Sequence, residues 1–180
     1  MWQFPRLRTM RSIPEIRYLR LSPQSLAAPQ VTGTEDSDMN VSTILKEKGN
    51  AVVTAAPSSS VLDIVKTLAD KRIGAIVLLN GEGRVAGIVS ERDIIRHLAR
   101  SGPAILSASV ADVMTRGVIT CTPADTIDVL MQKMTTGRFR HLPVVEHDRL
   151  VGLISIGDVV KNRVAEVELE ANAMKQYLST

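Results

Sequence analysis

The chain has 180 residues, of which 44% are hydrophobic and only 3% aromatic, and its formal net charge is +3. So many aliphatic residues exclude a chain that is disordered throughout, and no apolar run reaches the roughly 18 residues of a membrane-spanning helix. Residues 1–34 hold five arginines and one glutamate, whereas the remainder holds 17 basic and 18 acidic residues. Because a nucleic-acid-binding domain carries its own basic patch, we expect neither a nucleic-acid nor a membrane partner.

Residues 1–37 are expected to lie outside the folded part of the chain. They hold four prolines, scattered arginines and serines, and few acidic residues, a composition that resembles an organellar targeting peptide. The alternatives are a disordered tail and a start codon upstream of the natural one, and the stretch IPEIRYLRL is compatible with a short, marginal amphipathic helix. We expect a cytoplasmic protein, or a mitochondrial or other organellar one if the leader acts as a transit peptide.

From Asn40 onward the sequence repeats itself, in units that run over 38–103 and 104–165. Each unit is predicted to contain a short helix, an aliphatic strand, an amphipathic helix, a two-stranded hairpin and a closing helix. The hairpin strands are predicted at 75–79, 84–90, 141–145 and 149–155. One unit cannot cover both faces of its three-stranded sheet. We therefore predict an α+β fold in which the two units pack together with pseudo-twofold symmetry.

The last helix of the second unit has no stop signal and continues as an extension over 166–180. Apolar residues recur along it in alternating steps of four and three, at Val160, Val164, Val167, Ala171, Met174 and Leu178. This spacing is typical of a seam that packs on another helix. Packing on a second copy is favoured over packing on the chain's own body, because the first unit has no such extension. We expect a homodimer.

Each unit also contains the pattern Gly, two aliphatics, Ser, two variable residues and Asp, as GIVSERD and GLISIGD. Ser90 and Ser155 have the position of a helix N-cap, and Asp93 and Asp158 follow three residues later, as in a capping box. A hydroxyl and a carboxylate at a helix start can also contact a sugar phosphate. The residues alone leave both interpretations open.

The doubled pattern of an aliphatic stretch ending in proline, an amphipathic helix, a strand such as LPVV and Gly-x-x-Ser-x-x-Asp resembles a pair of CBS domains, the Bateman module. The resemblance covers about 40–165, and SERD, GRFRHLPVV and SIGDVV resemble a stand-alone subclass of bacteria and plant organelles. It implies a regulatory module that binds AMP, ADP, ATP, NAD(H) or S-adenosylmethionine between the repeats and signals to a partner by a conformational shift. The alternative is a protein-interaction module with unoccupied clefts, for example one with a redox partner such as thioredoxin.

The resemblance also assigns roles to individual residues. Asp93 and Asp158 match the carboxylate that receives the ribose hydroxyls, and Ser90 and Ser155 match the hydroxyl that contacts phosphate. Positions that line the adenine pocket are matched by Thr122 and Ile127, with Ala56 and Val61 as their equivalents in the first repeat. The stretch that meets adenine and phosphate is matched by Arg138, Phe139, Arg140 and His141, and Arg92 adds another guanidinium.

The two units differ in charge at this stretch. Three groups able to carry positive charge lie within 138–141, beside an apolar strand, where a bound anion would compensate them; a solvated turn is the alternative. The corresponding stretch of the first unit, 72–75, holds Arg72 alone. We expect one well-built nucleotide site, in which GLISIGD and the cluster at 138–141 face the same cleft, and leave the occupancy of the other cleft open.

The sequence offers no catalytic or metal-binding constellation. It contains no Gly-rich phosphate loop, and its three histidines are not at ligand spacing. Cys121 is the only cysteine, which excludes an intramolecular disulfide and a cysteine metal cluster, and the apolar stretch VITC predicts that it is buried. We therefore expect no enzyme activity, catalytic cofactor or metal.

Overall fold

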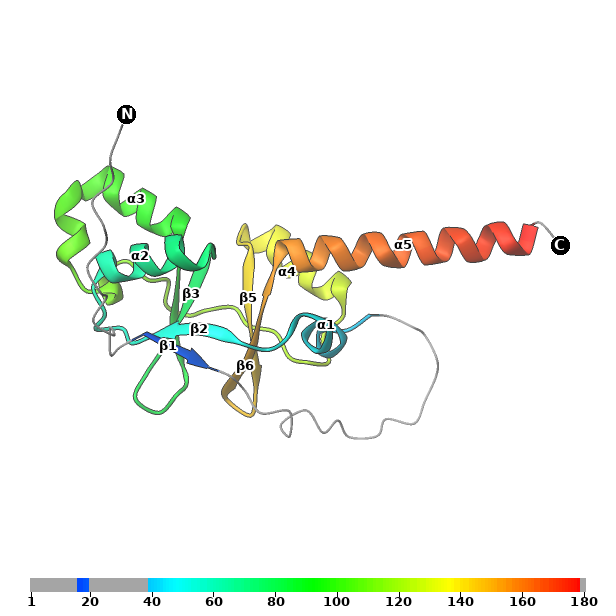
Figure 1. Ribbon diagram of the computed structural model, residues 1–180, viewed down its shortest axis with the longest axis horizontal. Coiled ribbons are helices and arrows are strands. Elements are labelled where there is room, and N and C mark those ends of the chain that lie inside the picture. Colours follow the sequence, from blue (N-terminus) through cyan, green and yellow to red (C-terminus); the bar gives the residue numbers. More distant parts are fainter. Residues whose placement is uncertain (1–15, 20–38, 179–180) are drawn as a thin grey trace, which may run out of the picture.

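The computed structural model describes residues 16–19 and 39–178, in which helices alternate with short strands (Figure 1). The elements are β1 (Ile16–Leu19), α1 (Val41–Lys48), β2 (Val52–Ala55), α2 (Val61–Lys71), β3 (Ala75–Leu79), β4 (Val85–Ser90), α3 (Glu91–Ser101), the 3-10 helices η2 (Pro103–Ser107) and η3 (Val110–Asp112), α4 (Ile127–Gly137), β5 (His141–Glu146), β6 (Arg149–Ser155) and α5 (Ile156–Leu178). None of the described helices is long and apolar enough to cross a membrane. The predicted α+β architecture of two tandem repeats is confirmed.

The first repeat builds a four-stranded sheet in the order β1-β2-β3-β4. The pair β2–β3 is parallel, and β3–β4 is the predicted hairpin. Strand β1 comes from the leader and pairs antiparallel with β2. The expectation that all of 1–37 lies outside the fold is therefore wrong for residues 16–19, which form a strand and not the marginal helix that their sequence allowed. The physical reason is that β2 would otherwise be an open edge with unpaired backbone groups. The rest of the leader lies outside the described residues.

The second repeat has only two extended strands, β5 and β6. Its predicted third strand is reduced to one parallel bridge, in which the Cys121 N–H donates to the Pro143 carbonyl at 3.0 Å. The pairing cannot extend forward because Pro123 has no backbone N–H. It cannot extend backward because Pro143, whose nitrogen would face the Ile119 carbonyl, likewise has no backbone N–H. The third strand has the expected place but not the expected length.

The short helix that opens each repeat packs into the core of the other repeat. Three residues of α1 are at most 2% exposed and join α4, β5 and β6 in the second core: Val41, Ile44 and Leu45. Reciprocally, Val110 and Val113 join the core of the first repeat. The backbone connects them in matching ways, because the Val41 N–H donates to the Asp125 carbonyl at 2.9 Å and the Val110 N–H to the Ser59 carbonyl at 2.8 Å. Figure 1 shows α1 beside α4 and β6.

The glycine of each repeated motif makes room for this exchange, in which α1 and η3 each pack into the core of the opposite repeat. A Cβ at Gly152 would lie 2.7 Å from Cδ2 of Leu45 on α1. A Cβ at Gly87 would lie 2.6 Å from Sδ of Met114 and 3.0 Å from the backbone oxygen of Thr115. The distances of 2.7 and 2.6 Å are shorter than a carbon atom tolerates, and the distance of 3.0 Å to the backbone oxygen is tight. Glycine is therefore needed where the opposite repeat crosses the strand.

Helix α5 begins on the second core, where Val159 is fully buried, and then runs away from the body (Figure 1). The apolar seam predicted along it is exposed: Val160 is 51%, Val164 50%, Val167 49%, Met174 61% and Leu178 77% accessible. The seam therefore does not pack on the chain's own body, so that alternative is wrong.

Candidate functional site

The repeated Ser-x-x-Asp segments end a strand and begin a helix in both repeats. The Asp93 carboxylate oxygen Oδ2 accepts from the Ser90 N–H at 2.9 Å and from its hydroxyl at 2.6 Å. Asp158 Oδ2 accepts the same two bonds from Ser155, both at 2.8 Å. Each serine hydroxyl in turn accepts from the aspartate N–H. The capping-box prediction is confirmed at both places, and each cap lies at the edge of a cavity.

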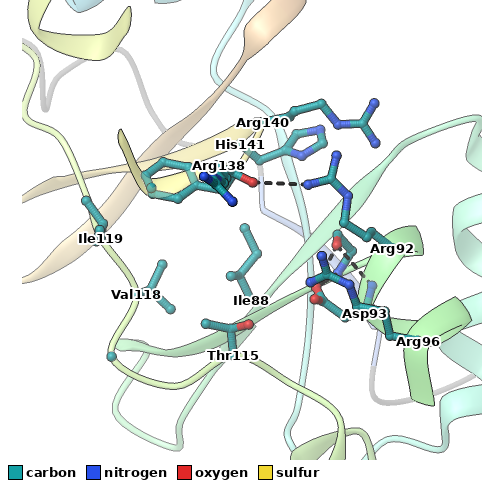
Figure 2. A pocket seen from close by; sticks show the side chains of 14 residues that line it. Ile88, Arg92, Asp93, Arg96, Thr115, Val118, Ile119, Arg138, Arg140 and His141 are labelled. Atoms are coloured by element: carbon teal, nitrogen blue, oxygen red, sulfur yellow. Dashed lines mark hydrogen bonds between the residues drawn. The ribbon is translucent and has the colours of Figure 1, made fainter. Parts of the chain in front are cut away.

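The first cavity, of about 330 Å³, lies between the two repeats at the start of α3. One wall is formed by the end of β4 and the first turns of α3, and another by the segment that follows η3. The turn from α4 into β5 closes it. The side chains that Figure 2 shows around it include Ile88, Arg92, Asp93, Arg96, Thr115, Val118, Ile119, Arg138, Arg140 and His141.

Positive charge dominates the first cavity. Four arginines line it, Arg92 and Arg96 from α3 and Arg138 and Arg140 from the opposite repeat. Among the described residues that line this cavity, Asp93 is the only acidic one. The guanidinium of Arg92 donates to the Arg138 carbonyl at 3.0 Å, a bond that joins the repeats across the cavity (Figure 2). Guanidinium groups bind phosphate in a bidentate manner, so this cavity can hold an anion beside a carboxylate.

The Arg138 backbone helps to turn this cluster into the cavity. Arg138 ends α4 in the left-handed conformation, with φ of 55°. Gly137 precedes it, and a Cβ there would collide with the ring of Phe139. The sequence Gly-Arg-Phe-Arg therefore allows the chain to reverse tightly between α4 and β5, with the arginines facing the cavity.

His141 lies between the two cavities and lines both. Burial lowers the pKa of its imidazole below the ordinary value, and the neighbouring Arg140 lowers it further, against the opposing attraction of Glu91. The imidazole is therefore neutral at pH 7. A neutral imidazole offers one donor and one acceptor at the place where the two repeats meet.

The second cavity, of about 350 Å³, lies at the start of α5 and is lined by Ser155 and Asp158. Its opposite wall comes from the first repeat and includes Lys48, Arg72 and Gly74. The Lys48 ammonium donates to Asp158 Oδ2 at 2.6 Å. Burial acts to raise the pKa of Asp158, but the hydrogen bonds from Lys48 and Ser155 outweigh it, so the pKa lies below its ordinary value.

A family model described as the CBS domain matches residues 48–100 and 110–165, the two repeats of this fold. The chain belongs to the CBS-domain family. It is 34% identical over 146 residues to the mitochondrial CBS domain-containing protein CBSX3 of Arabidopsis thaliana, a match that covers 77% of this chain and 71% of that protein. Other curated CBS relatives are longer, and the match spans only 24% and 23% of two of them.

Solved structures of CBS proteins share the fold. The CBS-domain containing protein ATU1752 from Agrobacterium tumefaciens is 44% identical with a TM-score of 0.69, over 73% of this chain and 98% of that one. PAE2072 from Pyrobaculum aerophilum, complexed with AMP, is 29% identical with a TM-score of 0.64, over 74% and 99%. The CBS pair of MJ0100, in complex with 5-methylthioadenosine and S-adenosylmethionine, is 25% identical with a TM-score of 0.64, over 72% and 98%.

The CBS pair separates the expected site residues into two groups. The first cavity is lined by Ser90, Arg92, Asp93, Arg138, Phe139, Arg140 and His141. The second contains Ser155, Asp158 and again His141. Arg138, Phe139 and Arg140 therefore line the cavity of Asp93 and not that of GLISIGD, which corrects the expected pairing, whereas His141 lines both cavities. The reason is that each cleft combines the cap of one repeat with the helix-to-strand turn of the other.

Four expected residues line neither cavity. Ile127 and Val61 are 1% and 0% exposed, because they are the first helical residues of α4 and α2 and point into the two cores. The Thr122 hydroxyl donates to the Asp125 carboxylate at 3.3 Å, and Ala56 stands at the equivalent position before its proline. Their assignment to the adenine pocket is not supported by this geometry.

In their place the first cavity uses Thr115, Gly117, Val118 and Ile119, and the second uses Lys48, Ala51, Val52 and Val53. Sequence reasoning missed them because the exchange of α1 and η3 shifts the lining toward the segment that precedes each proline. Arg96 was also missed, although it stands four residues after Arg92 on one helix face, where the two side chains are neighbours.

Cys121 is 1% exposed, which confirms the expected burial. Burial, together with the negative charge of Asp125, raises the pKa of its thiol to about 12. A thiol with that pKa is a poor nucleophile at neutral pH. Within 16–19 and 39–178, no group of three His, Cys, Asp or Glu side chains is arranged to hold a metal ion.

Proposed function

We propose that this protein is a regulatory module that binds an adenine nucleotide in the first cavity, with the ribose on Asp93 and the phosphates on the arginines. The observation that carries the proposal is the placement of four guanidinium groups around a single capped carboxylate. The Asp93 carboxylate accepts both bonds from Ser90 on Oδ2, and its second oxygen, Oδ1, can accept ribose hydroxyls. The AMP held by the similar protein PAE2072 supports this ligand class.

Charge selects among the possible adenine ligands. AMP, ADP, ATP and NAD(H) carry phosphates, which the four arginines attract. S-adenosylmethionine, the ligand of the similar MJ0100 pair, carries a sulfonium cation and no phosphate. The electrostatics of the first cavity therefore favour a phosphorylated ligand over S-adenosylmethionine.

The proposed signal is a change in the relative placement of the repeats. Arg92 and Arg96 belong to the first repeat, whereas Arg138 and Arg140 belong to the second, so one phosphate group can draw them together. Four clustered cations repel one another when no anion is bound. The size of any shift is limited by the difference in nucleotide affinity between the two arrangements. The role is regulatory, without turnover of the nucleotide.

A panel of AMP, ADP, ATP, NAD⁺, NADH and S-adenosylmethionine in thermal-shift and calorimetric titrations tests the proposal. The phosphorylated ligands should raise the melting temperature in proportion to ln(1 + [L]/Kd), and S-adenosylmethionine should raise it least. Stabilisation by S-adenosylmethionine alone would contradict the charge argument. Stabilisation by none of the six would refute nucleotide binding.

A second candidate, an interaction module, is favoured by the exposed seam of α5, whose valines at 160, 164 and 167 are each about half accessible. We propose that the seam pairs with a second copy of the chain, which makes the protein a homodimer. A redox partner such as thioredoxin finds no support at Cys121, since its thiol is buried with a pKa of about 12.

For the location of the protein, we propose import into an organelle. The basic, acid-poor composition of 1–37 and the similarity to a relative named as mitochondrial support it. A fluorescent protein fused behind residues 1–37 should enter mitochondria, and replacement of the five leader arginines by glutamine should abolish import. A diffuse cytoplasmic signal from the unmodified fusion would favour the cytoplasmic alternative.

A further inference from the structure

The two cavities are related by the pseudo-twofold axis, but they differ at the aspartate. Asp93 and Asp158 accept the same two bonds from their capping serines. Asp158 Oδ2 accepts a third bond, from the Lys48 ammonium at 2.6 Å, whereas Asp93 faces no lysine among the described residues that line its cavity. The carboxylate of the second cavity is thus already occupied by a cation of the chain itself.

Lys48 is held at this place by more than one contact. Its ammonium also donates to the Leu153 carbonyl at 2.8 Å. Lys48 is therefore bonded to a carbonyl at the end of β6 and to the carboxylate that caps the start of α5. Its side chain is 34% accessible and lines the second cavity. The ammonium attracts the carboxylate as an opposite charge as well as through a hydrogen bond, whereas a ribose hydroxyl is uncharged and offers a hydrogen bond alone. A ribose hydroxyl therefore competes poorly with this ammonium for Asp158.

The origin of the difference is a local length difference between the repeats. The chain takes 16 residue steps from Val41 to Pro57 but only 13 from Val110 to Pro123. The additional residues lengthen α1 so that it ends at Lys48, whereas η3 ends at Asp112. Counted from Val41 and Val110, the residue that corresponds to Lys48 is Gly117, which lines the first cavity without a side chain.

We propose that Lys48 closes the second cavity to nucleotides by occupying Asp158, so that each chain binds one nucleotide, in the first cavity. The inference rests on the proposed function of the first cavity. It assigns to Lys48 the part of an internal competitor for the ribose-binding carboxylate. The depressed pKa of Asp158, to which the Lys48 bond contributes, agrees with a tightly engaged carboxylate.

The test is the stoichiometry of AMP binding by calorimetry on the full chain. The unmodified protein should bind one AMP per chain, and Lys48→Met should bind two. The additional site should disappear in Lys48→Met/Asp158→Asn, while Asp158→Asn alone should leave the single site unchanged. Lys46→Met makes the same chemical change at an exposed position in the last turn of α1 and should still bind one. Lys48→Gln provides a second opening variant if Lys48→Met is poorly folded.

The outcomes separate this inference from the proposed function. Two sites in the unmodified chain, one of them lost in Asp158→Asn, would overturn the role of Lys48 and leave the first cavity intact. A single site in both Lys48 variants, or a loss of binding in them, would also overturn it. If the unmodified chain binds no AMP but Lys48→Met gains one site sensitive to Asp158→Asn, the role of Lys48 stands and the proposal for the first cavity fails.

Discussion

At the residue scale, one local geometry serves two different purposes in this protein. The serine hydroxyl and the carboxylate three residues later cap α3, and Ser60 and Asp63 make a similar cap on α2, with the hydroxyl donating to the carboxylate at 2.8 Å. Asp63 lines neither cavity. A cap is therefore no sign of a site by itself, and Asp93 becomes a candidate ligand-binding residue only because arginines from both repeats surround it.

Asp93→Asn should weaken AMP binding by about 1–3 kcal/mol, the scale of hydrogen bonds to a charged group. The asparagine oxygen can still accept from Ser90, so the helix cap is retained. Asp63→Asn is the matched control, because it makes the same change in the similar cap of α2, and it should leave affinity unchanged. Calorimetric titration measures both. Equal losses in the two variants would trace the effect to helix stability, and no loss in Asp93→Asn would remove Asp93 from the site.

His141 predicts a dependence of stability on pH. Its pKa is lowered in the folded state, so below about pH 6.5 the unfolded chain takes up a proton more readily than the folded chain. The contribution of His141 to stability is fully present above that pH and is lost as the pH falls toward the depressed folded value. Urea denaturation at pH 7.5 and 5.5 should show a smaller acid loss for His141→Gln than for the unmodified chain. An equal loss of unfolding free energy between pH 7.5 and 5.5 in the two proteins would show that His141 is not the group responsible.

At the scale of elements, the sequence predicts the hairpins and amphipathic helices of each repeat, but it does not predict that α1 and η3 pack into the core of the opposite repeat. Periodicity locates both hairpins and the amphipathic helices, because those signals depend on neighbouring residues. The apolar residues of 41–45 and 110–114 predict a buried face, but nothing in a local pattern tells which of two similar cores receives it. That ambiguity explains why the arginine cluster was expected to face Asp158. The assignment of Thr122 and Ile127 to the pocket follows instead from the resemblance, and Thr115 and Ile119 line the first cavity in their place.

Gly87→Ala should destabilise the fold by about 1–3 kcal/mol, the usual cost of overpacking a close contact. Its new methyl group meets the Met114 side chain, which can move, and the Thr115 carbonyl, which is fixed by pairing with Ile88. Since Thr115 lines the first cavity, AMP binding should weaken as well. Gly81→Ala, which meets nothing within 4 Å, is the control and should change the unfolding free energy by less than about 0.5 kcal/mol. Equal unfolding free energies of the two variants in urea denaturation would contradict a close contact between position 87 and the residues Met114 and Thr115.

At the scale of the whole molecule, the long exposed seam of α5 is the feature that a single chain leaves without a partner. An apolar stripe with steps of four and three residues is the pattern of helices that pair. The body of the chain buries the start of α5 but not the seam beyond it. The assembly of two chains and the opening of their clefts would therefore involve different parts of the molecule.

Val164→Glu should convert the proposed dimer into a monomer, because it places a charge in the middle of the seam. Leu169→Glu is the control: Leu169 is 67% exposed on the same helix but lies off the seam, so this variant should remain dimeric. Light scattering coupled to size-exclusion chromatography measures the mass of each. A monomeric unmodified chain, or dissociation by both variants alike, would refute the seam as the dimer interface.

Because α1 and η3 each pack in the opposite repeat, a single repeat cannot complete its own hydrophobic core. A polypeptide with a single repeat would lack the apolar helix that completes its core and would expose the helix meant for its neighbour. Two identical copies could satisfy each other only by trading these segments, so such a chain would be obliged to self-associate in order to fold. Fusion into one polypeptide removes the requirement that both halves be identical. Each half is then free to change separately, and Lys48 in one and Gly117 in the other show that they have diverged.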